Sequence, residues 1–252
     1  MNIFGSTRSS VHRNHALITP DTHVKAPLVD WLNSEAIFHI SPAMGARFLQ
    51  YTALMGDNSR SSELRETVER FVYVLEGSIK LTSKENKQTH ALRPGHYAFL
   101  PATSDWIVEA KRTAKLEIFE KQYVPLKGNP SVLRAIIGDA SQVSSEPFMG
   151  DPGAQLKTLL PKDAAFDMAV NLFTFQPGAT LPMVEIHVME HGLLLLEGAG
   201  VYRLGDSYYP ITAGDVIWMA SYCPQWWVAM GKTPSTYIYY KDVHRDSLED
   251  WK

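Results

Sequence analysis

The sequence predicts an all-β protein with two tandem β-barrels, and three observations carry this prediction. The chain has 252 residues, of which 45% are hydrophobic, which is enough for one large core or two small ones of about 100 to 130 residues. Short segments rich in Val, Ile, Leu, Tyr and Phe alternate with Gly, Pro, Asn and Asp, while stretches with helical periodicity are scarce. One β-rich stretch also occurs twice. So many short strands are typical of barrels and sandwiches.

The internal repeat favours two cores over one. Residues 69–77 align without gaps on residues 190–198, at an offset of 121 residues. Further along, residues 92–96 match residues 211–215 at an offset of 119, and an apolar run follows in each copy. The small change in offset fits a short loop deletion. The same β unit therefore occurs twice in tandem.

Apolar runs within and around the two copies predict the individual strands. We expect them at residues 47–54, 70–75, 78–81, 96–100, 115–120, 169–175, 184–188, 193–196, 200–204, 215–219 and 236–242.

Composition sets the expected boundaries of the units. Residues 41–125 are predicted to form the N-terminal barrel, and residues 166–252 the C-terminal barrel. Residues 126–165 are rich in Pro, Gly and Ser, which is typical of a connector. Residues 1–40 match neither copy, and we expect them to form an arm that packs across the barrels or against a neighbouring subunit of a homo-oligomer.

The charge distribution argues against nucleic acid as a partner. The net charge is -3, the sequence pI is about 6.3, and no run of Lys and Arg exceeds two residues. The first 25 residues contain no apolar core of a signal peptide, and no apolar run reaches the roughly 18 residues that cross a bilayer. The single cysteine, Cys223, cannot form an internal disulfide, which agrees with a reducing compartment. We expect a cytoplasmic protein with no membrane partner.

Candidate metal ligands gather in the second copy. Glu185, His187 and His191 precede Gly198 with the spacing Glu-x-His-x3-His-x6-Gly. Glu185 and His187 are two residues apart, so they point to the same face of a strand, and a short turn can bring His191 beside them. A later strand returns with Gln225, which can supply a fourth ligand. Without a thiolate, this mixed nitrogen and oxygen set favours an octahedral divalent ion over structural zinc.

An alternative is that these residues are ordinary polar positions on a half-exposed strand. The repeat argues against this interpretation. The equivalent positions in the first copy are Leu64, Glu66, Arg70 and Trp106, which make no plausible metal site. The same scaffold can thus fold without ligands, so the first barrel is expected to be a structural or interface module.

The two blocks of the second copy resemble the two cupin motifs, with informative departures. The usual forms are Gly-x5-His-x-His-x3-4-Glu-x6-Gly and Gly-x5-Pro-x-Gly-x2-His-x3-Asn. Here Glu185 stands at the first histidine position, His191 at the glutamate position and Gln225 at the final histidine position. This permuted set resembles the manganese site of the (S)-ureidoglycine aminohydrolase family. The opening stretch, with Thr7-Arg8 and residues 14–21, is similar to the start of that family, so the resemblance covers essentially the whole chain.

The resemblance implies a bicupin fold and a Mn2+ cofactor bound by Glu185, His187, His191 and Gln225. It also implies hydrolytic release of ammonia from (S)-ureidoglycine to give (S)-ureidoglycolate, a step in the catabolism of allantoin and other purine-derived ureides. The small molecule ureidoglycine would then be the substrate.

The resemblance also extends to three residues beyond the ligands. Tyr202, Tyr237 and Lys241 match family positions that line the substrate pocket, so these three and Glu185 are expected to bind substrate. Lys241 and Tyr237 are the expected catalytic residues.

Other interpretations stay open from the sequence alone. Tyr237 and Tyr239 can be core aromatics, and Lys241 can extend its ammonium to water. The same barrel could serve an iron-dependent cupin dioxygenase, or it could bind a ligand without catalysis.

Overall fold

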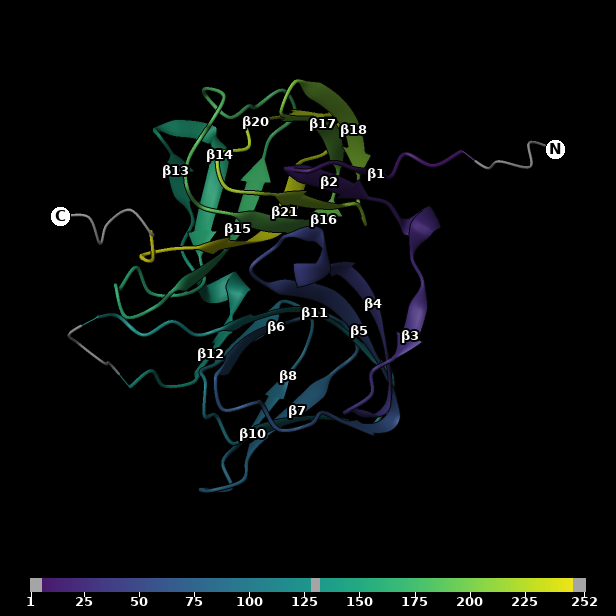
Figure 1. The fold of residues 1–252 in the computed structure, drawn as a ribbon, viewed down its shortest axis with the longest axis vertical. Helices are drawn as coiled ribbons and strands as arrows, with labels where there is room; N and C mark the ends of the chain where they lie inside the picture. The colour runs from purple at the N-terminus through teal and green to yellow at the C-terminus, as the bar shows by residue number, and fades with distance from the viewer. Residues whose placement is uncertain (1–5, 128–131, 247–252) are drawn as a thin grey trace. The chain divides into compact units, whose positions relative to one another are not determined.

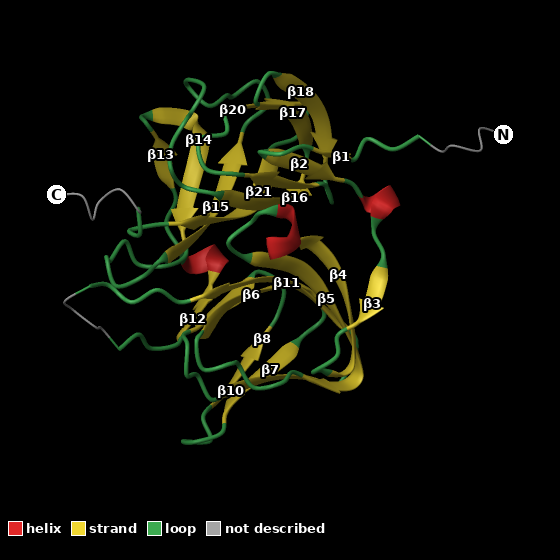
Figure 2. Cartoon of the chain, in the orientation of Figure 1, coloured by secondary structure: helices red, strands yellow, loops and turns green. Residues whose placement is uncertain are grey.

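The computed structural model describes residues 6–127 and 132–246, and it confirms the all-β fold class. Figure 2 shows strands joined by loops, with little helix between them. The helices in the described ranges are short 3-10 turns at Pro20–Thr22, Pro42–Met44 and Ala140–Gln142. None of them is long and apolar enough to span a membrane.

The described residues divide into two compact units. The C-terminal unit takes its residues from Met1–His23, Ser144–Thr158 and Met168–Lys252. The N-terminal unit takes its residues from Val24–Val143 and Leu159–Asp167. Each unit contains one copy of the sequence repeat.

The N-terminal unit is a single curled sheet of ten strands, most of which are labelled in Figure 1. The strands are β3 (Lys25–Pro27), β4 (Leu32–Ile40), β5 (Leu49–Arg60), β6 (Val68–Glu76), β7 (Ile79–Ser83), β8 (Thr89–Leu92), β9 (His96–Leu100), β10 (Trp106–Ala110), β11 (Ala114–Gln122) and β12 (Ile136–Asp139). Their hydrogen-bonded order is β12-β9-β6-β11-β5-β10-β7-β8, and β4 joins β3 to β5. Alternation along β5 points Tyr51, Ala53 and Met55 into the apolar core.

The C-terminal unit contains an eight-stranded and a three-stranded sheet. Its strands are β1 (Ser10–Val11), β2 (His15–Ile18), β13 (Glu146–Phe148), β14 (Asp151–Thr158), β15 (Met168–Phe175), β16 (His191–Glu197), β17 (Ala199–Leu204), β18 (Ser207–Thr212), β19 (Val216–Met219), β20 (Gln225–Met230) and β21 (Ser235–Asp242). The sheet orders are β1-β2-β19-β16-β21-β15-β14-β13 and β18-β17-β20. Residues from both sheets, including Phe173, Leu195 and Trp227, form one core cluster.

The first 40 residues, expected to form an arm across the barrels or against a neighbouring subunit, are divided between the two units. β2 pairs with β19 in the C-terminal unit and places His15 opposite Met219. β3 and β4 pair with each other, and β4 adds to β5 in the N-terminal unit. The side chains of Ala16 and Leu17 are buried in β2, so the start of the chain completes a core whose other residues lie far away in sequence.

The segment expected to be a connector also contains strands. Residues 126–165 include β12, β13 and β14, of which β14 pairs with β15 and β13 forms the edge of the eight-stranded sheet. Pro147 lies in this edge strand, where a missing N–H group is tolerated. The Pro and Gly content of this segment therefore marks an edge strand as well as loops.

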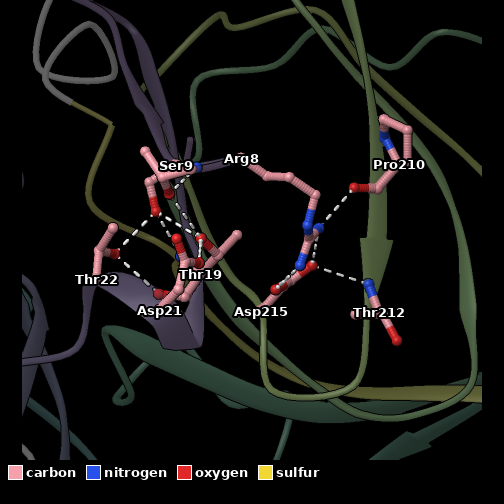
Figure 3. A network of polar contacts seen from close by, with 9 residues as sticks. Arg8, Ser9, Thr19, Asp21, Thr22, Pro210, Thr212 and Asp215 are labelled. Atoms are coloured by element: carbon pink, nitrogen blue, oxygen red, sulfur yellow. Dashed lines mark hydrogen bonds and ion pairs between the residues drawn. The ribbon is translucent and has the colours of Figure 1, made fainter. Parts of the chain in front are cut away.

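An ion pair ties the start of the chain to the C-terminal unit. The Arg8 guanidinium donates to both carboxylate oxygens of Asp215, over 2.7 and 2.9 Å. Figure 3 shows this pair beside a group of hydroxyls in which Ser9 and Thr19 are hydrogen-bonded to each other. The Asp215 side chain is fully buried and also accepts a hydrogen bond from the Thr212 backbone N–H. Two-point pairing of this kind fixes both position and orientation.

We predict that Arg8→Met destabilises the protein, because it leaves the buried Asp215 carboxylate without its guanidinium partner. The free energy of unfolding should fall by about 1–3 kcal/mol, measured by urea denaturation. Arg13 is an exposed arginine of the same segment and provides the control. Arg13→Met should change the stability by less than about 0.5 kcal/mol. Equal effects of the two substitutions would show that Arg8 does not anchor the segment.

Candidate active site

The candidate site begins at an isolated bridge between two distant parts of the chain. The Glu185 N–H donates to the Gln225 carbonyl over 2.8 Å, and the Gln225 N–H donates to the Glu185 carbonyl over 3.0 Å. The sequence predicted a strand at residues 184–188, but only Glu185 pairs in this way. The side chains of Met183 and Ile186 are exposed, so they point away from the core. A further hydrogen bond, from the Tyr222 N–H to the His187 carbonyl, holds the other end of this segment.

The bridge brings two imidazoles and one amide together. His187 Nε2 lies 3.2 Å from His191 Nε2 and 2.9 Å from Gln225 Nε2. His191 is the first residue of β16, and its neighbours across the sheet are Met219 in β19 and Lys241 in β21. Three residues from separate segments therefore converge at one point.

Local hydrogen bonds orient this cluster. The His187 Nδ1 atom lies 3.2 Å from the Met189 carbonyl, to which it can donate only if it carries the proton. This leaves the lone pair of the ring on Nε2, the atom that faces His191 and Gln225. The Asp242 carboxylate accepts from the Glu190 N–H over 2.5 Å and so holds the turn that leads into β16.

Burial shifts the pKa values of Glu185, His187 and His191 in the direction that disfavours the charged form of each side chain. It raises the pKa of the Glu185 carboxyl, although the nearby Lys241 ammonium opposes this shift. Burial also lowers the pKa of His187 and lowers that of His191 well below its usual value, and the charges of His187 and Lys241 add to the effect at His191. Both imidazoles are therefore neutral near pH 7, which is the form that binds a metal.

These residues line one cavity of about 170 Å³ in the C-terminal unit. All seven residues predicted for the site contribute to its wall: Glu185, His187, His191, Tyr202, Gln225, Tyr237 and Lys241. Sequence reasoning left Tyr239 open between core and pocket, and Tyr239 also lines the cavity. The strand spacing of two residues explains why Tyr237, Tyr239 and Lys241 share this face of β21.

Apolar wall residues were missed by sequence reasoning. They are Phe148, Phe173, Leu181, Met189, Leu193 and Met219. Leu193 lies two residues after His191 in the strand, so the same alternation could have identified it. Phe148 comes from the predicted connector, and nothing in the local sequence pattern points to it.

Three tyrosine hydroxyls add polar groups to this wall. Burial raises the pKa of Tyr202, Tyr237 and Tyr239 above the usual phenol value, so all three keep their protons near neutral pH. The ring centroids of Tyr202 and Tyr237 lie 6.5 Å apart, and those of Tyr237 and Tyr239 lie 5.7 Å apart. The Tyr202 hydroxyl also lies 3.5 Å from Gln225 Oε1.

The donor set fits a divalent cation by its chemistry. It offers two neutral imidazoles with their Nε2 atoms in contact, an amide, and the Glu185 carboxylate, whose ionised form burial disfavours without a positive partner. Within residues 6–127 and 132–246, no group of three or more His, Cys, Asp and Glu side chains is arranged to hold a metal ion. The side chains in direct contact are thus His187, His191 and Gln225, and Glu185 joins them through its backbone bridge and the shared cavity.

The equivalent place in the N-terminal unit is occupied by an ion pair. Arg70 aligns with His191, and its Nε donates to Glu120 over 2.5 Å. Arg70 lies opposite Glu120 in the neighbouring strand, just as His191 lies opposite Lys241 in the C-terminal unit. The Tyr51 hydroxyl also donates to Glu120, and the Trp31 ring covers the guanidinium at 5.1 Å. Arg70 has no lone pair to offer a cation, so this place lacks the ligand that His191 supplies in the C-terminal unit.

Comparisons with known proteins agree with this architecture. The EutQ-like cupin domain family matches residues 54–123. The crystal structure of protein Ylba from E. coli superposes with a TM-score of 0.83 and 31% identity, over 96% of each chain. Oxalate decarboxylase from Bacillus subtilis, a protein with Mn(II) centres, superposes with a TM-score of 0.69 over 98% of this chain and 81% of its own. At 10% identity it shares the fold alone. The predicted bicupin architecture is thereby confirmed.

Sequence relatives extend over nearly the whole chain. A protein from Oryza sativa subsp. japonica named "Probable (S)-ureidoglycine aminohydrolase" is 46% identical over 97% of this chain and 78% of its own length. The (S)-ureidoglycine aminohydrolase of Escherichia coli (strain K12) is 33% identical over 93% of this chain and 90% of its own length. At this identity and coverage, the chain belongs to the (S)-ureidoglycine aminohydrolase family.

Proposed function

We propose that this chain catalyses the hydrolytic release of ammonia from (S)-ureidoglycine, with Mn2+ held by Glu185, His187, His191 and Gln225. The observation that carries the proposal is that these four residues and Lys241 line one cavity in a chain of this family. The cavity therefore offers both side chains that can bind a metal ion and the Lys241 ammonium, which can pair with the substrate carboxylate.

The reaction replaces an amino group by a hydroxyl group on one carbon. The bond between that carbon and the amino nitrogen breaks, a bond to the oxygen of water forms, and the products are (S)-ureidoglycolate and ammonia. The substrate carries a carboxylate, an amine and a ureido group on this carbon. It thus needs a site with both cationic and neutral hydrogen-bonding groups.

A bound divalent cation supplies Lewis acidity at this site, and Mn2+ suits a set of imidazole and oxygen ligands that leaves positions open for water or substrate. The cost of burying the Glu185 carboxylate, seen in its raised pKa, is offset when that carboxylate faces a cation. The Mn(II) centres of a protein with the same fold support this choice of ion.

Two other residues act on the substrate in this proposal. Lys241 lies in β21 opposite His191, close enough for its charge to influence both Glu185 and His191. Its ammonium can pair with the substrate carboxylate, because an ammonium has no lone pair to offer a metal. Tyr237 is protonated and buried on the same strand face as Lys241, so its Oη can donate a hydrogen bond to a substrate oxygen.

The direct test measures ammonia release from ureidoglycine while an oxygen electrode follows oxygen uptake in the same reaction. We expect about one ammonia for each substrate consumed, (S)-ureidoglycolate as the product, and no oxygen uptake. Oxygen consumption coupled to turnover would favour a cupin dioxygenase. Binding of the substrate without ammonia release would favour a non-catalytic ligand-binding protein.

We predict about one divalent metal per chain, because only the C-terminal unit carries the ligand set. Elemental analysis of the purified protein should return one equivalent, and the double variant Glu185→Ala/His191→Ala should return none. Glu66 aligns with His187 in the first copy, so Glu66→Ala is the matched control and should keep the metal. Two metals per chain, or a double variant that still binds one, would contradict the ligand assignment.

We predict that Lys241→Met lowers turnover by a factor of about 100 or more, because it removes a positioned charge while keeping most of the side-chain length. Metal content, checked by elemental analysis, should stay at the wild-type level. Lys232 is exposed in the turn between β20 and β21, so Lys232→Met is the control and should leave turnover unchanged. Near wild-type turnover of Lys241→Met would show that Lys241 only extends to solvent.

A further inference from the structure

The side-chain amide of Gln225 faces the candidate metal position with its nitrogen. Gln225 Nε2 lies 2.9 Å from His187 Nε2, where it donates to the ring lone pair. Gln225 Oε1 points the other way, 3.5 Å from the Tyr202 hydroxyl. An amide N–H2 group has no lone pair for a cation, so a metal ligand must present the carbonyl oxygen instead.

A half-turn of the Gln225 amide about its Cγ–Cδ bond would present the carbonyl oxygen to the metal without moving the backbone. The rotation exchanges the places of Oε1 and Nε2, so Oε1 faces the imidazoles and Nε2 faces Tyr202. The new orientation of Gln225 then depends on whether Nε2 finds an acceptor. A buried amide nitrogen without an acceptor would oppose the rotation, and Gln225 is only 3% exposed.

Tyr202 is placed to provide that acceptor. Its strand β17 pairs with β20 so that Tyr202 lies opposite Trp227, diagonal to Gln225 on the same face. Its ring packs against Trp227, with 5.6 Å between centroids, and the side chain is 2% exposed. A phenol hydroxyl can donate to Oε1 in one orientation of Gln225 and accept from Nε2 in the other.

We propose that Tyr202 is a positioning residue, which turns the Gln225 carbonyl toward the metal by accepting a hydrogen bond from Gln225 Nε2. This proposal rests on the assignment of Gln225 as a metal ligand in the proposed function. It adds a role for Tyr202 that acts through Gln225, and it requires no contact between Tyr202 and the substrate.

The rotation also changes what the Tyr202 proton can do. In the structure, the Tyr202 hydroxyl can donate to Gln225 Oε1. Once Tyr202 accepts from Gln225 Nε2, its own proton is released from Gln225 and can be donated to another acceptor in the cavity that Tyr202 lines.

The test is a double-mutant cycle read out as Mn2+ affinity, measured by titrating the metal-stripped protein and following free Mn2+ by electron paramagnetic resonance. Tyr202→Phe should weaken Mn2+ binding by about 10-fold to 100-fold, as expected for the loss of a group that orients a metal ligand. In a Gln225→Glu background the same substitution should have no effect, because a carboxylate presents an oxygen in either orientation. Tyr209→Phe is the control and should keep wild-type affinity, since the Tyr209 hydroxyl is hydrogen-bonded to His15, outside the ligand set.

Two outcomes would overturn the proposal. Wild-type affinity of Tyr202→Phe would show that the hydroxyl does not orient Gln225. Equal weakening in both backgrounds would show that Tyr202 acts through packing alone. Neither measurement uses ureidoglycine, so a failure of the proposed reaction would be seen separately, as absent ammonia release with intact metal affinity.

A measurement on the unsubstituted protein covers the case in which Tyr202→Phe does not fold. The 15Nε2 resonance of Gln225, identified by its absence in Gln225→Glu, should move when diamagnetic Zn2+ is added, because carbonyl coordination changes the amide bond. An unmoved resonance with Zn2+ bound would mean that the amide does not present its carbonyl, and the proposal would fail.

Discussion

The reciprocal backbone hydrogen bonds between Glu185 and Gln225 are the constraint on which the candidate site depends. They join the segment between β15 and β16 to the start of β20, two parts of the chain that no continuous ladder connects at this point. Because this pairing fixes the backbone, the Glu185, His187 and Gln225 side chains all face one cavity. His191 reaches the same cavity from the first position of β16, where the sheet holds it opposite Lys241.

Burial gives this geometry its chemical character. A carboxyl that resists ionisation, two imidazoles that resist protonation and three tyrosines that keep their protons all reflect the low polarity inside the barrel. In the proposed site, a bound cation would restore favourable interactions for groups that have left water. At the equivalent place in the N-terminal unit, the charges of Arg70 and Glu120 neutralise each other in an ion pair.

The repeat, the all-β class and the grouping of the candidate ligands could be predicted from sequence, because alternation along strands and fixed motif spacing are local signals. The seven predicted site residues meet in one cavity for this reason. Long-range pairing was not predictable in the same way. The pairing of His15–Ile18 with β19 and the wall position of Phe148 depend on partners far away in sequence. The single bridge at Glu185 was missed because an extended segment with alternating side chains looks the same whether or not a neighbouring strand pairs along its length.

The central claim is that one metal in the C-terminal unit drives ammonia release, and a stoichiometric activity titration tests it most directly. Metal-stripped protein would receive Mn2+ in steps while ammonia release from (S)-ureidoglycine is followed at each step. The account predicts no release without metal, a linear rise in rate, and a sharp break at about one Mn2+ per chain. Full activity in the stripped protein, or a break at two equivalents, would contradict it.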